Sequence, residues 1–205
     1  AWVEALAREH IREVENPTRK DLTNRYTKRV RLAATLGLIL DREEWIDAAI
    51  EGTRRFIRES LRADGSSWDL EHRDSLTYHI SALRNPIDIA IVLNDRDLYT
   101  WEPTAGGSLK KSVDFVVPYA TGEKEHEEWV NSKVDLDRRR AEAGLAKYRP
   151  GRIFEPKRAL SLLEKAAYFD PSLMEIVRDL SDSEAERFPT WQTLVNAAAR
   201  ADARG

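Results

Sequence analysis

Residues 27–61, TKRVRLAATLGLILDREEWIDAAIEGTRRFIRESL, carry the pattern that decides the fold. Apolar residues fill most positions up to Leu40, which predicts a helix that is buried on most sides. Asp41 is a good helix N-cap, and after it apolar residues recur at three- and four-residue spacing from Trp45 to Leu61. Residues 41–61 therefore predict an amphipathic helix that follows the buried one after a short turn.

The remaining chain repeats this alternation of buried helix, short turn and exposed helix. Pro86 predicts a kink or a break within residues 68–94, and we find no convincing alternating strand. Further helices are expected at about 2–16, 109–117, 156–169, 171–180 and 190–203, with an exposed, highly charged helix or lid at 123–146. Successive helical hairpins build toroids or solenoids. We therefore predict an all-α fold, an (α/α) toroid or incomplete toroid, formed by residues 1–205 as one domain.

Composition excludes several classes of function. The 205 residues include 33 basic and 36 acidic side chains and no basic arm, which argues against nucleic acid as a partner. No apolar run approaches the ~20 residues of a membrane span. The absence of cysteine excludes disulfides and thiolate nucleophiles. The chain opens with the amphipathic Ala-Trp-Val-Glu rather than a signal peptide, so we expect a mature, processed or truncated chain.

The candidate chemistry is concentrated in residues 64–79, DGSSWDLEHRDSLTYH. Arg73 and Tyr78 are five residues apart, so on a straight helix they would point about 140° away from each other. They converge on one site only if a helix begins near Asp74 and leaves Arg73 before it. Asp74 and Ser75 are both good N-caps, which makes such a start plausible.

This run of Asp-Gly-Ser, Leu-Glu-x-Arg and Tyr-His resembles the central motif of the alginate-lyase superfamily of polysaccharide lyases. The resemblance extends over the helices on either side, residues 33–62 and 80–93. Residues 118–124, PYATGEK, with Trp129-Val130 are similar to the glucuronan-lyase-like branch. The superfamily implies an (α/α) toroid and the cleavage of a uronic-acid polymer by β-elimination.

The resemblance also implies roles for individual residues. Tyr78 would take the proton from sugar C5 and protonate the leaving O4, with Arg73 orienting it. An Asn-Asn-His run that neutralises the uronate carboxylate falls at residues 23–25, where Asn24 is retained and Arg25 stands in place of the histidine. The family further implies no cofactor, an anionic polysaccharide as partner and a secreted or periplasmic location. Its members have additional N-terminal helices, so we expect this chain to be short at that end.

Physical reasoning supports these roles in part. Arg25 is always cationic and can clamp a carboxylate in bidentate fashion. Cationic neighbours favour the phenolate form of Tyr78, while His72 or His79 would serve as base if Tyr78 were the acid. Trp68 is a candidate for stacking on sugar rings. Glu71, in the same motif, completes the substrate-binding candidates.

Other interpretations remain open at this stage. Tyr78 and His79 also fit a core stripe, and a family member that lacks the histidine could be a non-catalytic carbohydrate-binding or scaffold domain. A helical-toroid glycoside hydrolase would need two opposed carboxylates, and Glu71 and Asp74 lie too close in one motif for that. Metal binding is not expected, because no HExxH or comparable ligand spacing occurs. The oligomeric state is not indicated.

Overall fold

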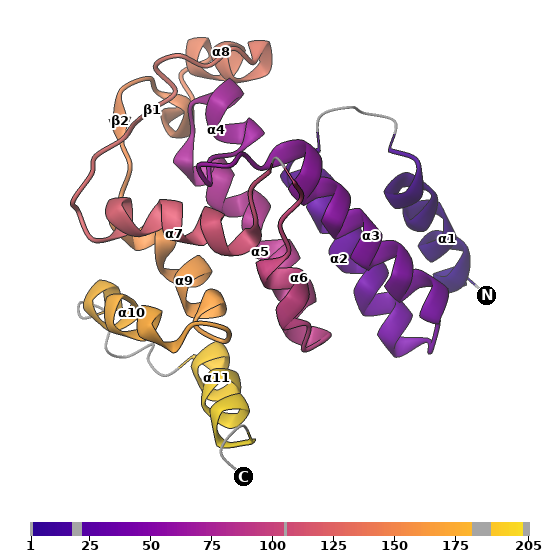
Figure 1. The fold of residues 1–205 in the computed structure, drawn as a ribbon. Helices are drawn as coiled ribbons and strands as arrows, with labels where there is room; N and C mark the ends of the chain where they lie inside the picture. Colours follow the sequence, from indigo (N-terminus) through magenta and orange to yellow (C-terminus); the bar gives the residue numbers. More distant parts are fainter. Residues whose placement is uncertain (1, 18–21, 105, 182–189, 203–205) are drawn as a thin grey trace.

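The computed structural model describes residues 2–17, 22–104, 106–181 and 190–202, and it confirms the all-α prediction. Helices α2 (Asn24–Ile39) and α3 (Glu43–Ser60) are joined by a three-residue turn and pack on each other as an antiparallel hairpin (Figure 1). Helix α1 (Trp2–Glu15) packs against both of them. The (α/α) toroid stays a prediction.

The central part of the fold is a short helix followed by a long one. Helix α4 (Trp68–Arg73) ends at Asp74, which adopts the left-handed conformation (φ 52°) that Asp tolerates better than most residues. Helix α5 (Leu76–Val92) then begins with Ser75 as its N-cap and packs along α2. Of the kink or break predicted at Pro86, the break is wrong, because α5 continues through that residue and the helix break lies at Asp74–Ser75 instead.

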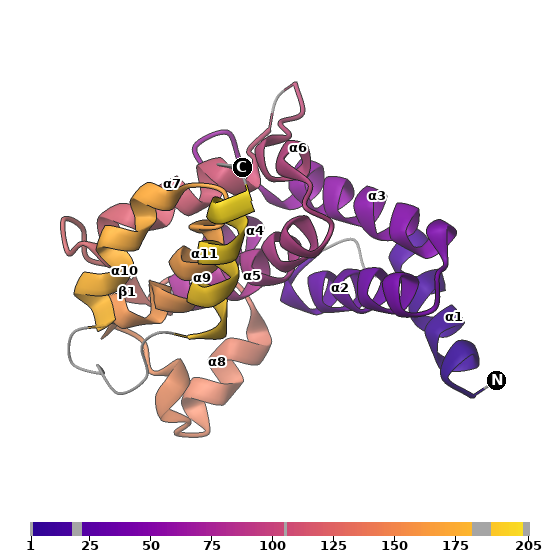
Figure 2. The ribbon, with the colours of Figure 1, turned by 90° about the horizontal axis from the view of Figure 1, so that it is seen from below.

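The larger part of the C-terminal half packs on the other side of α5 from α1–α3 (Figure 2). Its elements are α6 (Arg96–Thr100), α7 (Leu109–Ala120), β1 (Glu127–Glu128), α8 (Asp135–Glu142), η1 (Ala146–Tyr148), β2 (Arg152–Ile153), η2 (Pro156–Ala159), α9 (Leu160–Ala166), η3 (Pro171–Leu173), α10 (Met174–Ser181) and α11 (Trp191–Asp202). Helix α7 continues beyond its predicted end at Val117 and through Pro118.

The charged segment 123–146, which was predicted as a helix or lid, is part of a small substructure of residues 123–155. We call this substructure the lobe. It contains β1, α8, η1 and β2, and lies beside α4 (Figure 1). Strands β1 and β2 pair in antiparallel fashion. They were not predicted, because two residues are too few to show an alternating pattern.

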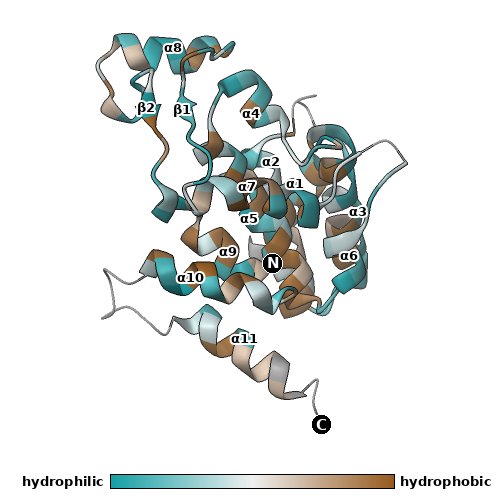
Figure 3. Ribbon diagram, turned by 60° about the vertical axis from the view of Figure 1, so that its left-hand side comes forward, coloured by the Kyte–Doolittle hydropathy of each residue, from teal (hydrophilic) through white to brown (hydrophobic). Residues whose placement is uncertain are grey.

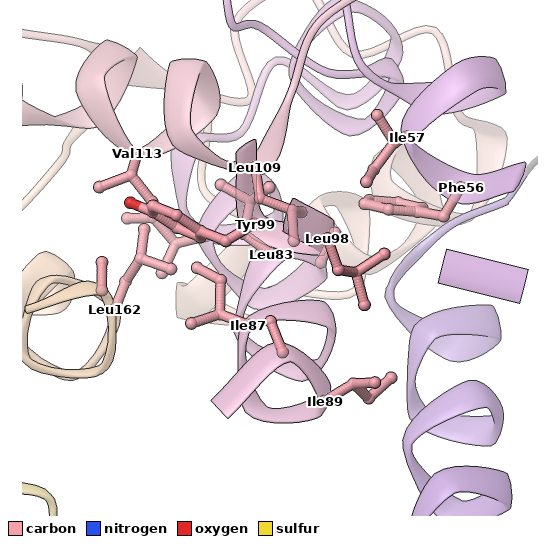
Figure 4. Close-up of a cluster of buried hydrophobic side chains, with 14 of the residues drawn as sticks. Phe56, Ile57, Leu83, Ile87, Ile89, Leu98, Tyr99, Leu109, Val113 and Leu162 are labelled. Carbon is pink, nitrogen blue, oxygen red and sulfur yellow. The ribbon is translucent and has the colours of Figure 1, made fainter. Parts of the chain in front are cut away.

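The core lies between α5 and its neighbours on both sides. Figure 4 shows Phe56 and Ile57 from α3, Leu83 and Ile87 from α5, and Leu162 from α9 within one buried cluster. The last turn of α2 departs from the predicted burial, because Leu38 and Ile39 are 46% and 72% exposed. Helix α11 contacts α9 and carries exposed apolar side chains at the edge of the molecule (Figure 3).

Candidate functional site

The helix break at Asp74 brings Arg73 and Tyr78 together. The sequence spacing of the two residues required such a break for their side chains to converge. The Arg73 guanidinium carbon lies 3.7 Å from the centre of the Tyr78 ring, which is a cation–π contact. Its Nε and Nη2 donate to the two carboxylate oxygens of Asp137 on α8, at 2.8 and 2.5 Å. Arg73 is buried, and its fork is occupied by Asp137. Its geometry therefore suits orienting the Tyr78 ring more than holding a substrate carboxylate.

Main-chain groups attach the lobe to the motif. The Trp129 N–H donates to the Asp74 carbonyl and the Lys133 N–H to the His72 carbonyl, both at 2.7 Å. The fully buried Glu128 carboxylate accepts from Ser75 Oγ at 3.0 Å and from the Thr77 N–H at 2.8 Å. An anion at the first turn of α5 is favourable for the helix dipole. The lobe is therefore held on the α4–α5 junction independently of its exposed side chains.

The hydroxyl of half-buried Tyr78 is part of a short hydrogen-bond chain. It lies 3.0 Å from the hydroxyl of Tyr148, which in turn accepts from Arg140 Nη1 at 2.8 Å. Burial and the hydrogen bond with Tyr78 raise the pKa of Tyr148 to about 12. Trp129 packs edge-on against Tyr78, with ring centres 5.4 Å apart. Both tyrosines are thus fixed in place by the lobe.

Two pockets meet at Tyr78. The larger one, of about 450 Å³, is lined by Asn24, Lys28, Thr77, Tyr78, Ile80, Ser81, Arg84, Lys147 and Arg158. The smaller one, of about 190 Å³, is lined by Thr23, Asn24, Arg25, Lys28, Trp68, Arg73, Tyr78, Val134, Leu136 and Arg140. Asn24, Lys28 and Tyr78 line both pockets, so we treat them as one groove with Tyr78 at its middle.

The charge of this groove is opposite in sign to that of the chain. The larger pocket presents Lys28, Arg84, Lys147 and Arg158, and the smaller one adds Arg25, Arg73 and Arg140. None of the described residues that line either pocket is a carboxylate, although the chain as a whole carries a net charge of −3. A concave surface with cations alone attracts anionic ligands.

Five of the predicted site residues line the smaller pocket together: Asn24, Arg25, Trp68, Arg73 and Tyr78. Asn24 Nδ2 is 3.5 Å from Ser81 Oγ on α5. Arg25 is exposed and makes no ion pair with any described residue. Asn24 and Arg25 therefore have side chains available to a ligand, whereas Arg73 is engaged with the protein.

His79 lies on the opposite side of α5. It is fully buried, with Nδ1 2.7 Å from Ser67 Oγ and Nε2 3.4 Å from the Ser112 carbonyl oxygen. Burial lowers its pKa to about 4. A neutral histidine that lines neither of the two pockets supports the fold rather than a proton transfer at Tyr78.

His72 and Glu71 also lie outside both pockets. The His72 ring stacks on Trp68, with ring centres 4.4 Å apart, and so supports a side chain that does line the groove. Glu71 accepts two hydrogen bonds from Arg62, at 2.9 and 3.2 Å, which hold the pKa of its carboxyl below the usual value. Its carboxylate is exposed and faces Arg62 rather than the groove.

Sequence reasoning missed several groove residues. Some had a readable signal: Lys28 lies four residues after the predicted Asn24 on α2, and Thr77, Ser81 and Arg84 follow helical spacing on α5, so each set shares one polar helix face. The lobe and its neighbour η2 contribute Arg140, Lys147 and Arg158 to the groove, and Tyr148 to the hydrogen bond with Tyr78. These had no signal, because their proximity to Tyr78 depends on tertiary contacts over many residues.

Comparison with known proteins identifies the family. A model of the alginate lyase family matches residues 1–126, more than half of the chain, including α4, α5 and Tyr78. The chain belongs to the alginate lyase family. Membership confirms the predicted resemblance and supports polysaccharide lyase activity in general. No curated protein and no solved structure matches the chain.

The structure also bears on other ligands. Among the described residues, none of the helices has the length and apolar character needed to cross a membrane. The described part of the chain likewise contains no group of three or more His, Asp or Glu side chains placed to hold a metal ion.

Proposed function

We propose that this alginate lyase family member cleaves a uronic-acid polymer by β-elimination, with Tyr78 as the acid and base. One observation carries the proposal. Tyr78 lines two pockets whose charged lining residues, among those described, are all cations. A polyuronate has a carboxylate on successive sugars, so a chain that runs along the groove meets cations on both sides of Tyr78.

The reaction can be written with the groups present. The Tyr78 phenolate takes the proton from C5, the C–H electron pair forms the C4–C5 double bond, and the C4–O4 bond breaks. The leaving O4 then takes the proton from Tyr78, which restores the phenolate. One side chain thus acts as base and acid in turn, and no cofactor is needed.

The groove cations have a distinct task. Removing the C5 proton places negative charge next to a carboxylate, and preorganised donors lower that barrier. Asn24 and Arg25, which line the smaller pocket, are the proposed donors to the carboxylate of the reacting sugar. Arg73 is proposed to orient Tyr78 through its ring contact, and Trp68 to pack against a sugar ring.

Alginate and glucuronan are the proposed polymers, because the motif at residues 118–124 resembles the glucuronan-lyase-like branch. We further propose a single domain over residues 1–205. A continuous core supports this, since buried side chains from Ala7 to Val177 form one cluster. Alginate lyases are generally extracellular, which supports a secreted or periplasmic location.

Ultraviolet absorbance tests the activity without a label. Elimination leaves an unsaturated uronate that absorbs strongly, so incubation with alginate or polyglucuronate should give a rising signal. Tyr78→Phe should remove the signal, and Tyr168→Phe should retain it, since Tyr168 bonds Asn94 and lines neither pocket. A flat signal from folded protein on every polyuronate would reject catalysis by this chain.

Binding without turnover is the second candidate function. It is favoured by Arg25, which stands where the family has histidine, and by the positions of His72 and His79 outside both pockets. Calorimetric titration with polyuronate oligosaccharides separates the two functions. Saturable binding that Arg25→Gln weakens, in the absence of any elimination product, would establish the binding domain.

A further inference from the structure

We infer that Tyr148, held by Arg140, is a positioning residue that donates a hydrogen bond to the Tyr78 hydroxyl oxygen and stabilises its base form. The inference rests on the proposed function for its role in catalysis, but the hydrogen bond itself can be tested without turnover. Tyr148 and Arg140 lie beyond the stretch that the family model matches, which ends at residue 126.

The direction of the hydrogen bonds follows from counting protons. A guanidinium only donates, so the Tyr148 hydroxyl must accept from Arg140 Nη1 at 2.8 Å. The Tyr148 proton then remains available for the Tyr78 oxygen, 3.0 Å away. Once Tyr78 is a phenolate it can only accept, and Tyr148 is the described donor in contact with it. Arg140 thereby orients Tyr148 for donation.

The surroundings of the two phenols indicate that Tyr148 keeps its hydroxyl proton when one of the pair is ionised. Tyr148 is 8% exposed and packs against Trp129, with ring centres 5.1 Å apart, whereas Tyr78 is half-buried and lines both pockets. A phenol closed off from water keeps its proton, because burial disfavours the charged form. The raised pKa of Tyr148 agrees with this assignment. Tyr78 is the member of the pair that can exchange a proton with a ligand in the groove.

The charged side chains that line the pockets at Tyr78 are cations. Arg73 contacts its ring from α4, and Lys147 from η1 lies 5.3 Å from the ring centre. Lys28 from α2, Arg84 from α5, Arg140 from α8 and Arg158 from η2 line the same groove. The described carboxylates beside these cations are paired with them: Asp137 accepts from Arg73, Glu128 accepts from Ser75, Thr77 and Arg152, and Glu155 accepts from Arg158. Asp69 lies 3.8 Å from Arg73. Cations therefore line the groove at Tyr78, and Tyr148 adds a neutral donor at its oxygen.

The pH dependence of kcat/KM on a polyuronate tests the catalytic consequence. In Tyr148→Phe the rise of kcat/KM at the acidic side of the pH profile should move to higher pH by about one unit or more. At pH values below this rise, kcat/KM should fall by about tenfold or more. Both effects are expected for the loss of a hydrogen bond to a charged group. KM should change little, because Tyr148 lines neither pocket. An unchanged profile in folded Tyr148→Phe overturns the inference.

Three further variants separate positioning from packing. Arg140→Gln should shift the rise of kcat/KM in the same direction by less, and Arg140→Lys, which restores a cationic donor, should return it toward wild type. Tyr168 bonds Asn94 and lines neither pocket, so Tyr168→Phe should match wild type. A shift in Tyr168→Phe as large as that in Tyr148→Phe would overturn the assignment.

Carbon-13 NMR of ring-labelled tyrosine decides the case in which the wild type shows no turnover. The chain has six tyrosines, and the Tyr78 resonance is the one missing from Tyr78→Phe. Absence of turnover rejects the proposed function alone. Tyr78 ionising at higher pH in Tyr148→Phe than in the wild type supports the inference, and equal ionisation midpoints overturn it.

Discussion

Helix α5 has two faces with opposite tasks, and Tyr78 and His79 show the difference in adjacent residues. Tyr78 points to a groove of cations and reaches a second tyrosine from the lobe. His79 points into the core, where burial keeps it neutral. Both are titratable residues of one sequence motif, yet only the first is placed for proton transfer to a ligand. Residue type and spacing indicate which residues are candidates for a functional role. The helix face on which each one lies then distinguishes groove residues from core residues.

The largest expected effect is on the groove face. Tyr78→Phe removes only the hydroxyl of a residue that lines both pockets and is the proposed acid and base, so kcat should fall by about 10²–10⁴-fold. The free energy of unfolding should change by only about 1 kcal/mol, the value of one hydrogen bond. Elimination kinetics and urea denaturation on the same preparation measure both. Loss of activity accompanied by a large loss of stability would assign Tyr78 to the core after all.

A core substitution on the same helix should show the reverse. Leu83 is fully buried in the cluster of Figure 4, and Leu83→Ala should lower the free energy of unfolding by about 2–5 kcal/mol. Val92→Ala, at a position 56% exposed on α5, is the control and should cost less than about 0.5 kcal/mol. Urea denaturation with a shared slope gives the comparison. Equal losses in the two variants would contradict the described packing.

The buried histidine predicts a pH-dependent stability. Because the pKa of His79 falls from 6.5 to about 4 on folding, the unfolded chain binds more protons between these values. The contribution of His79 to the free energy of unfolding is therefore fully present above pH 6.5. As the pH is lowered to 4, the free energy of unfolding falls by about 3 kcal/mol. Urea denaturation at pH 7 and pH 4 in wild type and His79→Gln isolates this contribution. The control is His10→Gln, at a histidine on α1 that is not buried. If His79→Gln lost as much stability as the wild type, His79 would not be the cause.

The smallest expected effect concerns the distal groove cations. Arg84→Gln or Lys147→Gln should raise KM for a polyuronate by about two- to tenfold with little change in kcat, and added salt should reduce the difference. Lys110→Gln, an exposed cation paired with Asp114 away from the groove, is the matched control. A KM that responds equally to all three substitutions would indicate general charge attraction rather than a groove.

The sequence predicted what depends on local pattern. Helical spacing indicated the α2–α3 hairpin, and the capping residues Asp74 and Ser75 indicated how Arg73 and Tyr78 could converge. The last turn of α2 was mispredicted, because apolar Leu38 and Ile39 are exposed in the structure and composition alone does not show which neighbours cover them. Tyr148 was missed for a related reason. It is 70 residues from Tyr78, and only the seating of the lobe brings them together.

The main-chain attachment of the lobe has a consequence for divergence among relatives. The N–H groups of residues 129 and 133 hold the lobe on the α4–α5 junction, and a backbone donor is indifferent to most changes of side chain. Mutations at Val134, Leu136 or Lys147 can therefore alter what this wall of the groove offers while leaving the wall where it stands. The lining of the groove on the lobe side can thus change without a change in the α4–α5 junction that carries Arg73 and Tyr78.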